Sequence, residues 1–166
     1  MTIYHIVIYT LQMRSVADHD ELLPALNELL EAERAGARVA FRTAKEVLEP
    51  ELESLVMAIQ RDEAHWCDIL AKAIHRLGFE SSKKTGMFYA KAMAIGDIPS
   101  RLAFLNRGQS WVVRKLLTLL PAVHDDRIRA DLGAMLNAHE RNIALVAARL
   151  PSGSAAGGAP SGGLSQ

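Results

Sequence analysis

Hydrophobic residues recur every three or four positions along four stretches of the chain, the spacing that places them on one face of a helix. Signals for helix starts and stops lie at the ends of these stretches: Pro50 opens the second, Gly78 follows it, and Pro151 follows the fourth. The four stretches are 20–48, 50–77, 98–120 and 126–150. The sequence therefore predicts an all-α protein built on four long helices.

The connections between the predicted helices differ in length, and this predicts how the helices run. The first two meet around Glu49 with almost no linker, so we expect them to be antiparallel neighbours. The second and third are separated by 79–97, which holds a short apolar piece, 87–95, suited to one or two helical turns. This connection is far longer than a tight helix hairpin needs. We expect it to cross the bundle from end to end and to make these two helices parallel.

The two ends of the chain differ in composition from its centre. Residues 1–17 are predicted to be a flexible N-terminal extension, although Ile3–Tyr9 is β-branched and aromatic, which by itself favours a strand. Residues 18–150 are predicted to form one helical domain. Residues 151–166 are rich in Gly, Ser, Ala and Pro and are predicted to be a disordered tail.

Composition and charge exclude several classes of protein. Nineteen Lys and Arg balance nineteen Asp and Glu, so no net positive field favours nucleic-acid binding. No apolar run reaches the length of a membrane span. The single cysteine, Cys67, cannot form an internal disulfide, and we therefore expect a cytoplasmic protein.

Each predicted helix carries a polar residue near its centre, on its apolar face. Glu33 interrupts the first stripe, and Asp62 and His65, three residues apart, interrupt the second. Gln109 and His139 do the same in the third and fourth. Helix centres meet at one height in parallel and antiparallel packing alike. An unpaired buried carboxylate lowers the stability of the folded state by roughly several kcal/mol. The convergence of these residues at one level therefore indicates a common site.

Four segments around these residues resemble a bacterial branch of the ferritin-like superfamily that has no assigned activity. They are Leu29–Gly36, Arg61–His65, Leu105–Gln109 and His139–Ile143. The resemblance covers residues 20–150 and implies a ferritin-like four-helix bundle with a long crossover between helices 2 and 3. It also implies a non-haem metal centre, because dimetal members of the superfamily bind metal through a Glu, a Glu-x-x-His, a second Glu and a second Glu-x-x-His.

The resemblance assigns metal ligands to this chain residue by residue. Glu33 matches the first ligand, and Asp62 with His65 matches the first Glu-x-x-His, with Asp in place of Glu. His139 matches the last ligand, while Gln109 stands where the third helix has its carboxylate. These assignments predict that Glu33, Asp62, His65 and His139 bind one Fe, Mn or Zn ion with open positions for water or dioxygen.

Other residues complete or limit this ligand set. The position three residues before His139 is Leu136 rather than an acid, so two of the six dimetal ligands are absent. Glu63 and Glu140 add oxygens if their helices rotate slightly, because both also continue an apolar stripe. Gln109 fits a residue that hydrogen-bonds to a ligand better than it fits a ligand itself.

Three functions follow from these observations. The first is a non-haem metal protein, an oxidase, peroxide scavenger or metal handler, acting on a small molecule that the sequence does not identify. The alternative is a metal-free helical bundle with an interaction or stress-protection role, in which the mid-helix polar residues hydrogen-bond to one another. The third is iron storage in a cage. Because helical bundles commonly pair along exposed apolar faces, a homodimer is also expected.

Overall fold

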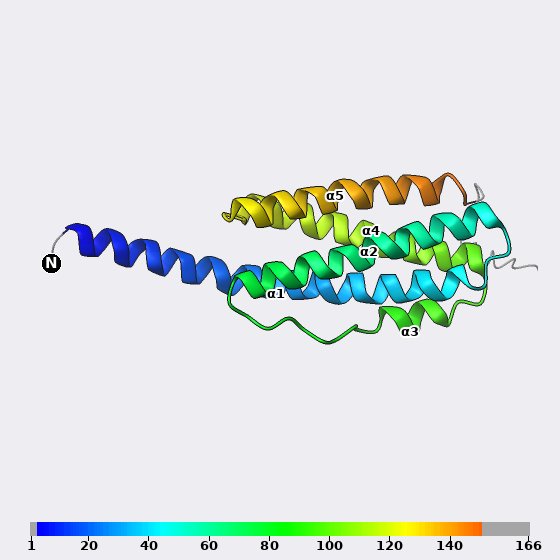
Figure 1. Cartoon of the computed structure of the whole chain (residues 1–166), viewed down its shortest axis with the longest axis horizontal. Coiled ribbons are helices and arrows are strands. Elements are labelled where there is room, and N and C mark those ends of the chain that lie inside the picture. Colours follow the sequence, from blue (N-terminus) through cyan, green and yellow to red (C-terminus); the bar gives the residue numbers. More distant parts are fainter. Residues whose placement is uncertain (1–2, 151–166) are drawn as a thin grey trace, which may run out of the picture.

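The computed structural model describes residues 3–150, and within this range it is all-helical, without strands (Figure 1). The all-α prediction is confirmed. The helices are α1 (Ile3–Ala44), α2 (Pro50–Arg76), α3 (Phe88–Met93), α4 (Ile98–Leu119) and α5 (Asp126–Ala147), and a short 3-10 helix, Leu120–Ala122, follows α4. Within the described residues, no helix is long and apolar enough to cross a membrane.

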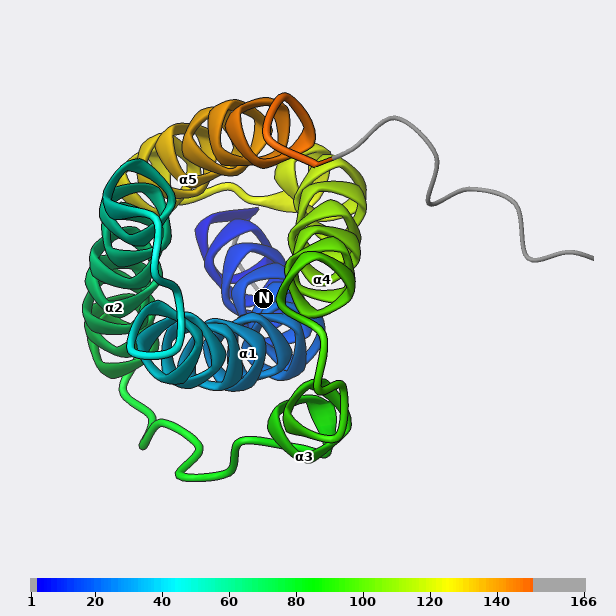
Figure 2. The ribbon, with the colours of Figure 1, turned by 90° about the vertical axis from the view of Figure 1, so that its right-hand side faces the viewer.

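The four long helices surround a common interior, and the short α3 lies outside it (Figure 2). α1 packs mainly against α2, and α4 mainly against α5. The segment between α2 and α3 runs back along the length of the molecule, so that α2 and α4 point in the same direction (Figure 1). The long connection therefore crosses the molecule from end to end, and α2 and α4 are parallel, as its length predicts.

The first helix is longer than the sequence pattern indicates. We expected it to begin near Asp20, but α1 begins at Ile3, so residues 3–17, expected as a flexible extension, continue the helix. This N-terminal part projects beyond the other helices (Figure 1). β-branched residues favour strands only where a partner strand is available, and none is present in the described part of the chain. The predicted tail, 151–166, lies outside the described residues.

Local signals in the sequence fix where the helices begin and end. The side chain of Asp97 accepts a hydrogen bond from the backbone N–H of Ser100, and Asp125 accepts two at the start of α5. At the end of α2, Gly78 has φ +87°, a left-handed conformation that suits glycine. The predicted end at Gly78 is therefore confirmed.

The interior consists of two apolar clusters with polar residues between them. One cluster includes Leu26, Leu30, Leu70, Leu116, Leu132 and Met135. The other includes Val39, Ala40, Val56, Ile59, Leu105 and Val146. Along each long helix, the polar residue lies between the part that contributes to one cluster and the part that contributes to the other. We call the four residues at this level the polar layer: Glu33, Glu63, Gln109 and His139.

Candidate functional site

The polar layer takes one side chain from each long helix. Glu33 comes from α1, Glu63 from α2, Gln109 from α4 and His139 from α5. Their exposed fractions are 2%, 3%, 2% and 1%, so all four are withdrawn from water. Charged and amide groups are rarely buried to this extent without partners, and the layer therefore carries a cost that packing alone does not explain.

Glu33 and His139 form the one ion-pair contact within the polar layer. Nε2 of His139 lies 3.0 Å from Oε1 of Glu33, and Nδ1 lies 3.0 Å from the backbone oxygen of Met135. Because a carbonyl oxygen only accepts, Nδ1 must carry a hydrogen and donate it. The remaining proton lies between Nε2 and Oε1, giving either an ion pair or a neutral acid beside a neutral imidazole. In both forms the pair has no net charge, and it can exchange one proton with a bound molecule.

Burial sets the protonation of the two carboxyl groups. Burial raises the pKa of Glu33, and the charge of Asp62 adds to this rise, while His139 opposes it. Burial also raises the pKa of Glu63 well above its ordinary value, and the charges of Glu33 and Asp62 raise it further. For His139, burial lowers the pKa, but the charge of Glu33 and two hydrogen bonds outweigh burial and raise it. The site therefore favours a protonated, neutral Glu63.

The register of α2 differs from the one we predicted. His65 is exposed, and its ring meets the ring of Trp66 edge-on, with 4.8 Å between the ring centroids. Asp62 is half-buried and accepts a hydrogen bond of 3.1 Å from Nδ2 of Asn142. Glu63 takes the interior position instead. The prediction that His65 faces the core is wrong, and the slight helix rotation we considered for Glu63 is the arrangement that the structure adopts.

The position of Trp66 explains this register. Trp66 is buried together with Ile59 and Leu70, and the helix face that contains all three also contains residue 63. His65 lies about 100° around the helix from Trp66, which turns it toward solvent. In α5, Glu140 is the next residue after the buried His139, so it lies about 100° around the helix from it and is exposed.

One buried polar residue near the layer was not predicted. Asn142 lies one turn beyond His139 and holds Asp62 through its amide. A signal was present in the sequence, because position 142 continues the stripe of Leu132, Met135 and His139. This contact places a carboxylate at the edge of the polar layer and contributes to the raised pKa of Glu63.

Several polar atoms in the layer have no hydrogen-bond partner in the described part of the chain. These atoms are Oε2 of Glu33, Oε2 of Glu63, and both Oε1 and Nε2 of Gln109. Each such buried atom costs about 1–3 kcal/mol when it remains unpaired. A folded protein that keeps four of them at one level has groups available for a molecule that binds there.

Two glycines make room for the side chains of the site. A Cβ atom at Gly36 would stand 2.8 Å from Cδ of Glu63, so the absence of a side chain there lets this carboxyl approach α1. A Cβ at Gly108 would stand 2.6 Å from Cζ of Phe88, so Gly108 lets the ring from α3 rest on α4. Both glycines lie in segments that carry the family resemblance.

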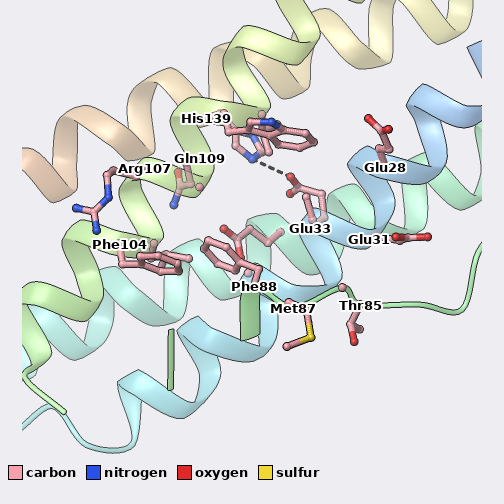
Figure 3. Close-up of a pocket in the computed structure, with 18 residues that line it drawn as sticks. Glu28, Glu31, Glu33, Thr85, Met87, Phe88, Phe104, Arg107, Gln109 and His139 are labelled. Atoms are coloured by element: carbon pink, nitrogen blue, oxygen red, sulfur yellow. Dashed lines mark hydrogen bonds and ion pairs between the residues drawn. The ribbon is translucent and has the colours of Figure 1, made fainter. Parts of the chain in front are cut away.

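A cavity of about 470 Å³ lies against the polar layer, between α1, α4 and the segment that precedes α3. All four residues of the layer line it. Figure 3 shows the contact between His139 and Glu33 on one side of this space, with Gln109, Phe104 and Phe88 around it. The apolar lining includes Met87, Phe88, Phe104, Leu105, Trp111 and Val112. A largely apolar cavity with a few convergent polar groups has the usual character of a small-molecule site.

The segment between α2 and α3 closes one side of the cavity and is held on α1. The backbone N–H of Ser82 donates to Oδ1 of Asn27 at 2.7 Å, and its hydroxyl bonds to Glu31. One turn further along α1, Nη1 of Arg34 donates to the backbone oxygen of Lys84 at 2.6 Å. These contacts position Thr85 and the residues that follow it at the cavity wall.

The four predicted metal ligands, Glu33, Asp62, His65 and His139, are not brought together around one ion. Within residues 21–150, no three His, Cys, Asp or Glu side chains are placed to hold one ion. Glu33 and His139 contact each other, but Asp62 is bonded to Asn142 and His65 is outside. The residues present therefore do not fit the ligand set that the resemblance implied.

Comparisons with known proteins give one match. A family model described as "Domain of unknown function (DUF6306)" matches residues 20–148. Neither a curated protein nor a solved structure matches the chain. The matched range contains all four residues of the polar layer and all of the cavity lining.

Proposed function

The chain belongs to the DUF6306 family, a domain of unknown function, and we propose from the geometry of its site that it binds a small molecule in the cavity beside the polar layer. The ligand has an apolar body and at least one hydrogen-bonding group. The observation that carries this proposal is Gln109, which is buried, lines the cavity and leaves both atoms of its amide unpaired. A ligand that bonds to this amide recovers the energy lost by burying it.

The same observation argues against a purely structural role for the layer. A structural network is stable when each member satisfies its neighbours, and Gln109 bonds to none of the other three. The Glu33–His139 pair gives the bound molecule a neighbour that can take or return a proton at Oε2 of Glu33.

We propose that this bundle is of the ferritin-like type, supported by the long crossover and by the mid-helix level of the layer.

The test uses Gln109→Leu, with Asn137→Leu as the matched control because Asn137 is exposed. A library of small aromatic and aliphatic molecules is screened by thermal shift and by the fluorescence of Trp111, which lines the cavity. We expect hits on the wild type and the control to be lost in Gln109→Leu. We also expect Gln109→Leu without ligand to be more stable by about 1–3 kcal/mol, because two unpaired polar atoms are removed. Failure of the library to bind, or equal binding to Gln109→Leu, contradicts the proposal.

A second candidate function is binding of one Fe, Mn or Zn ion. The observation that favours it is the pair of unpaired oxygens, Oε2 of Glu33 and Oε2 of Glu63, at the level of the imidazole of His139. Carboxylate and imidazole groups suit these ions, but in the structure Glu33, Glu63 and His139 are not placed to hold one, so the Glu33–His139 contact must open to admit it. The ligands in this candidate site are Glu33, Glu63 and His139, so Glu63 takes the place of the predicted ligands Asp62 and His65.

Metal content decides this second candidate. Protein without a histidine tag is measured by elemental mass spectrometry before and after anaerobic addition of Fe(II). We expect about one ion per chain in the wild type and in His65→Ala, and loss of metal in Glu63→Gln. No metal in the wild type contradicts the candidate and favours the metal-free bundle.

A sizing column tests the proposals of an iron-storage cage and of a homodimer, because a cage, a dimer and a monomer elute at different volumes.

A further inference from the structure

Among the described residues, the polar end of the cavity has two carboxyl groups, each with an oxygen that has no hydrogen-bond partner, and it has no unpartnered cation. Glu33 and Glu63 both line it, and the only imidazole there, His139, already uses both of its nitrogens. Arg107 also lines the cavity, but it is exposed at the rim and lies over the ring of Phe104, with 5.4 Å between Cζ and the centroid. The described lining therefore has no unpartnered cation at its buried end to meet an anionic ligand.

The acids at the rim are already partnered. Glu28 forms an ion pair with Lys115, and Glu31 bonds to the hydroxyl of Ser82. Electrostatic selectivity must therefore come from the buried end. There, Gln109 contributes an unpaired amide oxygen, a second acceptor independent of the carboxyl groups. Three acceptor oxygens on α1, α2 and α4 match the three N–H donors of an alkylammonium group.

We propose that the ligand class of this cavity is an apolar primary amine, an inference that rests on the proposed function. The ammonium group binds between Oε2 of Glu33 and Oε2 of Glu63, with Oε1 of Gln109 as its third acceptor. The hydrocarbon or aromatic body lies along Phe88 and Phe104. A buried ammonium requires a paired carboxylate, and this cavity supplies one without removing it from another partner.

The charge of the bound ammonium is balanced within the site. Glu33 already has His139 as its partner, so the carboxylate that pairs with R–NH3⁺ is that of Glu63, and no covalent bond changes. Glu33 on α1 and Asp62 on α2 are the charged groups that act on Glu63, while α4 contributes the uncharged Gln109.

The experiment compares three molecules with one body and different head groups: 4-phenylbutylamine, 4-phenylbutanol and 4-phenylbutanoate. Calorimetric titration of the full chain in phosphate buffer reports the affinity for each molecule. We expect the amine to bind about tenfold or more tightly than the alcohol, and the carboxylate to bind most weakly.

Glu63→Gln and the exposed Glu140→Gln are the matched variants. In Glu63→Gln, we expect the preference for the amine over the alcohol to fall about tenfold, while Glu140→Gln behaves as the wild type. Circular dichroism confirms that both variants are folded. Binding of the alcohol or the carboxylate as tightly as the amine overturns the amine assignment and leaves the proposed function standing. Absence of binding by all three molecules and by the screened library overturns both.

Discussion

The protonation of Glu63 makes a prediction about stability and pH that is independent of any ligand. Glu63→Gln replaces a buried carboxyl group with an amide of nearly the same shape, and the amide cannot ionise. Because burial raises the pKa of Glu63, the folded state binds one more proton than the unfolded state between the ordinary glutamate pKa, about 4.3, and the raised value. The stability that this protonated group contributes is complete below the ordinary pKa. It is lost as pH rises through the folded-state pKa.

The size of the effect follows from this one-proton difference. Each proton changes the free energy of unfolding by about 1.4 kcal/mol per pH unit within the window. The wild type should therefore lose stability relative to Glu63→Gln at up to about this slope as the pH rises above about 4.3. Glu33 and His139 also have raised pKa values and are present in both proteins, so the difference between the proteins reports the loss of Glu63 together with its effect on Glu33.

Urea denaturation followed by circular dichroism at a series of pH values measures this difference. Glu140→Gln is the control, because it makes the same chemical change at an exposed position of α5. The stability gap between Glu63→Gln and the wild type should widen with pH, and the gap for Glu140→Gln should not follow it. A gap for Glu63→Gln that stays constant from pH 4 to pH 8 would refute the assignment of Glu63 as a buried acid.

Three further predictions concern local packing and chemistry. Gly36→Ala should destabilise the protein by about 1–2 kcal/mol in urea denaturation, because the new Cβ meets the Glu63 carboxyl group, whereas Gly133→Ala, with open space around it, should stabilise by about 0.5–1 kcal/mol. Equal effects at the two positions would contradict the close approach at Gly36. Asp125→Ala should cost about 1 kcal/mol at pH 7. Because backbone amides lower the pKa of Asp125, this cost should shrink as the pH falls through that lowered value, and a cost independent of pH would count against the cap. Partial burial raises the pKa of the Cys67 thiol to about 12, so iodoacetamide at pH 8.5 should alkylate it about 50-fold more slowly than in urea-unfolded protein, as mass spectrometry would show; equal rates would disprove the raised pKa.

The helical pattern of the sequence was sufficient to predict most of the fold. Apolar spacing located the four long helices, and Gly78 and Pro50 marked their limits. These signals are local, because each depends on residues within a few positions of one another. The start of α1 was the exception, since Ile3–Tyr9 has the composition of a strand and only the absence of a partner strand in the described residues leaves it helical.

The sequence also predicted a polar level at mid-height, but it did not decide which residues belong to it. Glu33, Gln109 and His139 were found because each is isolated on an apolar face. On α2, Asp62 and Glu63 both continue that face, at spacings of three and four residues from Ile59, and differ by about 100° around the helix. Tertiary packing made the choice, because burying Trp66 turns Glu63 inward and leaves His65 in solvent.

The cavity depends wholly on tertiary structure. Its lining comes from α1, α2, α4, α5 and the segment before α3, and no local pattern relates residues so distant along the chain. Gly36 and Gly108 show the limit most clearly: in the sequence each is a glycine within a helix, a mildly unfavourable choice. Only the packed structure shows that a carboxyl group and an aromatic ring occupy the space that their side chains would fill. The sequence by itself determined the helices and the height of the polar residues, while helix rotation and packing decided which groups meet and what space they leave.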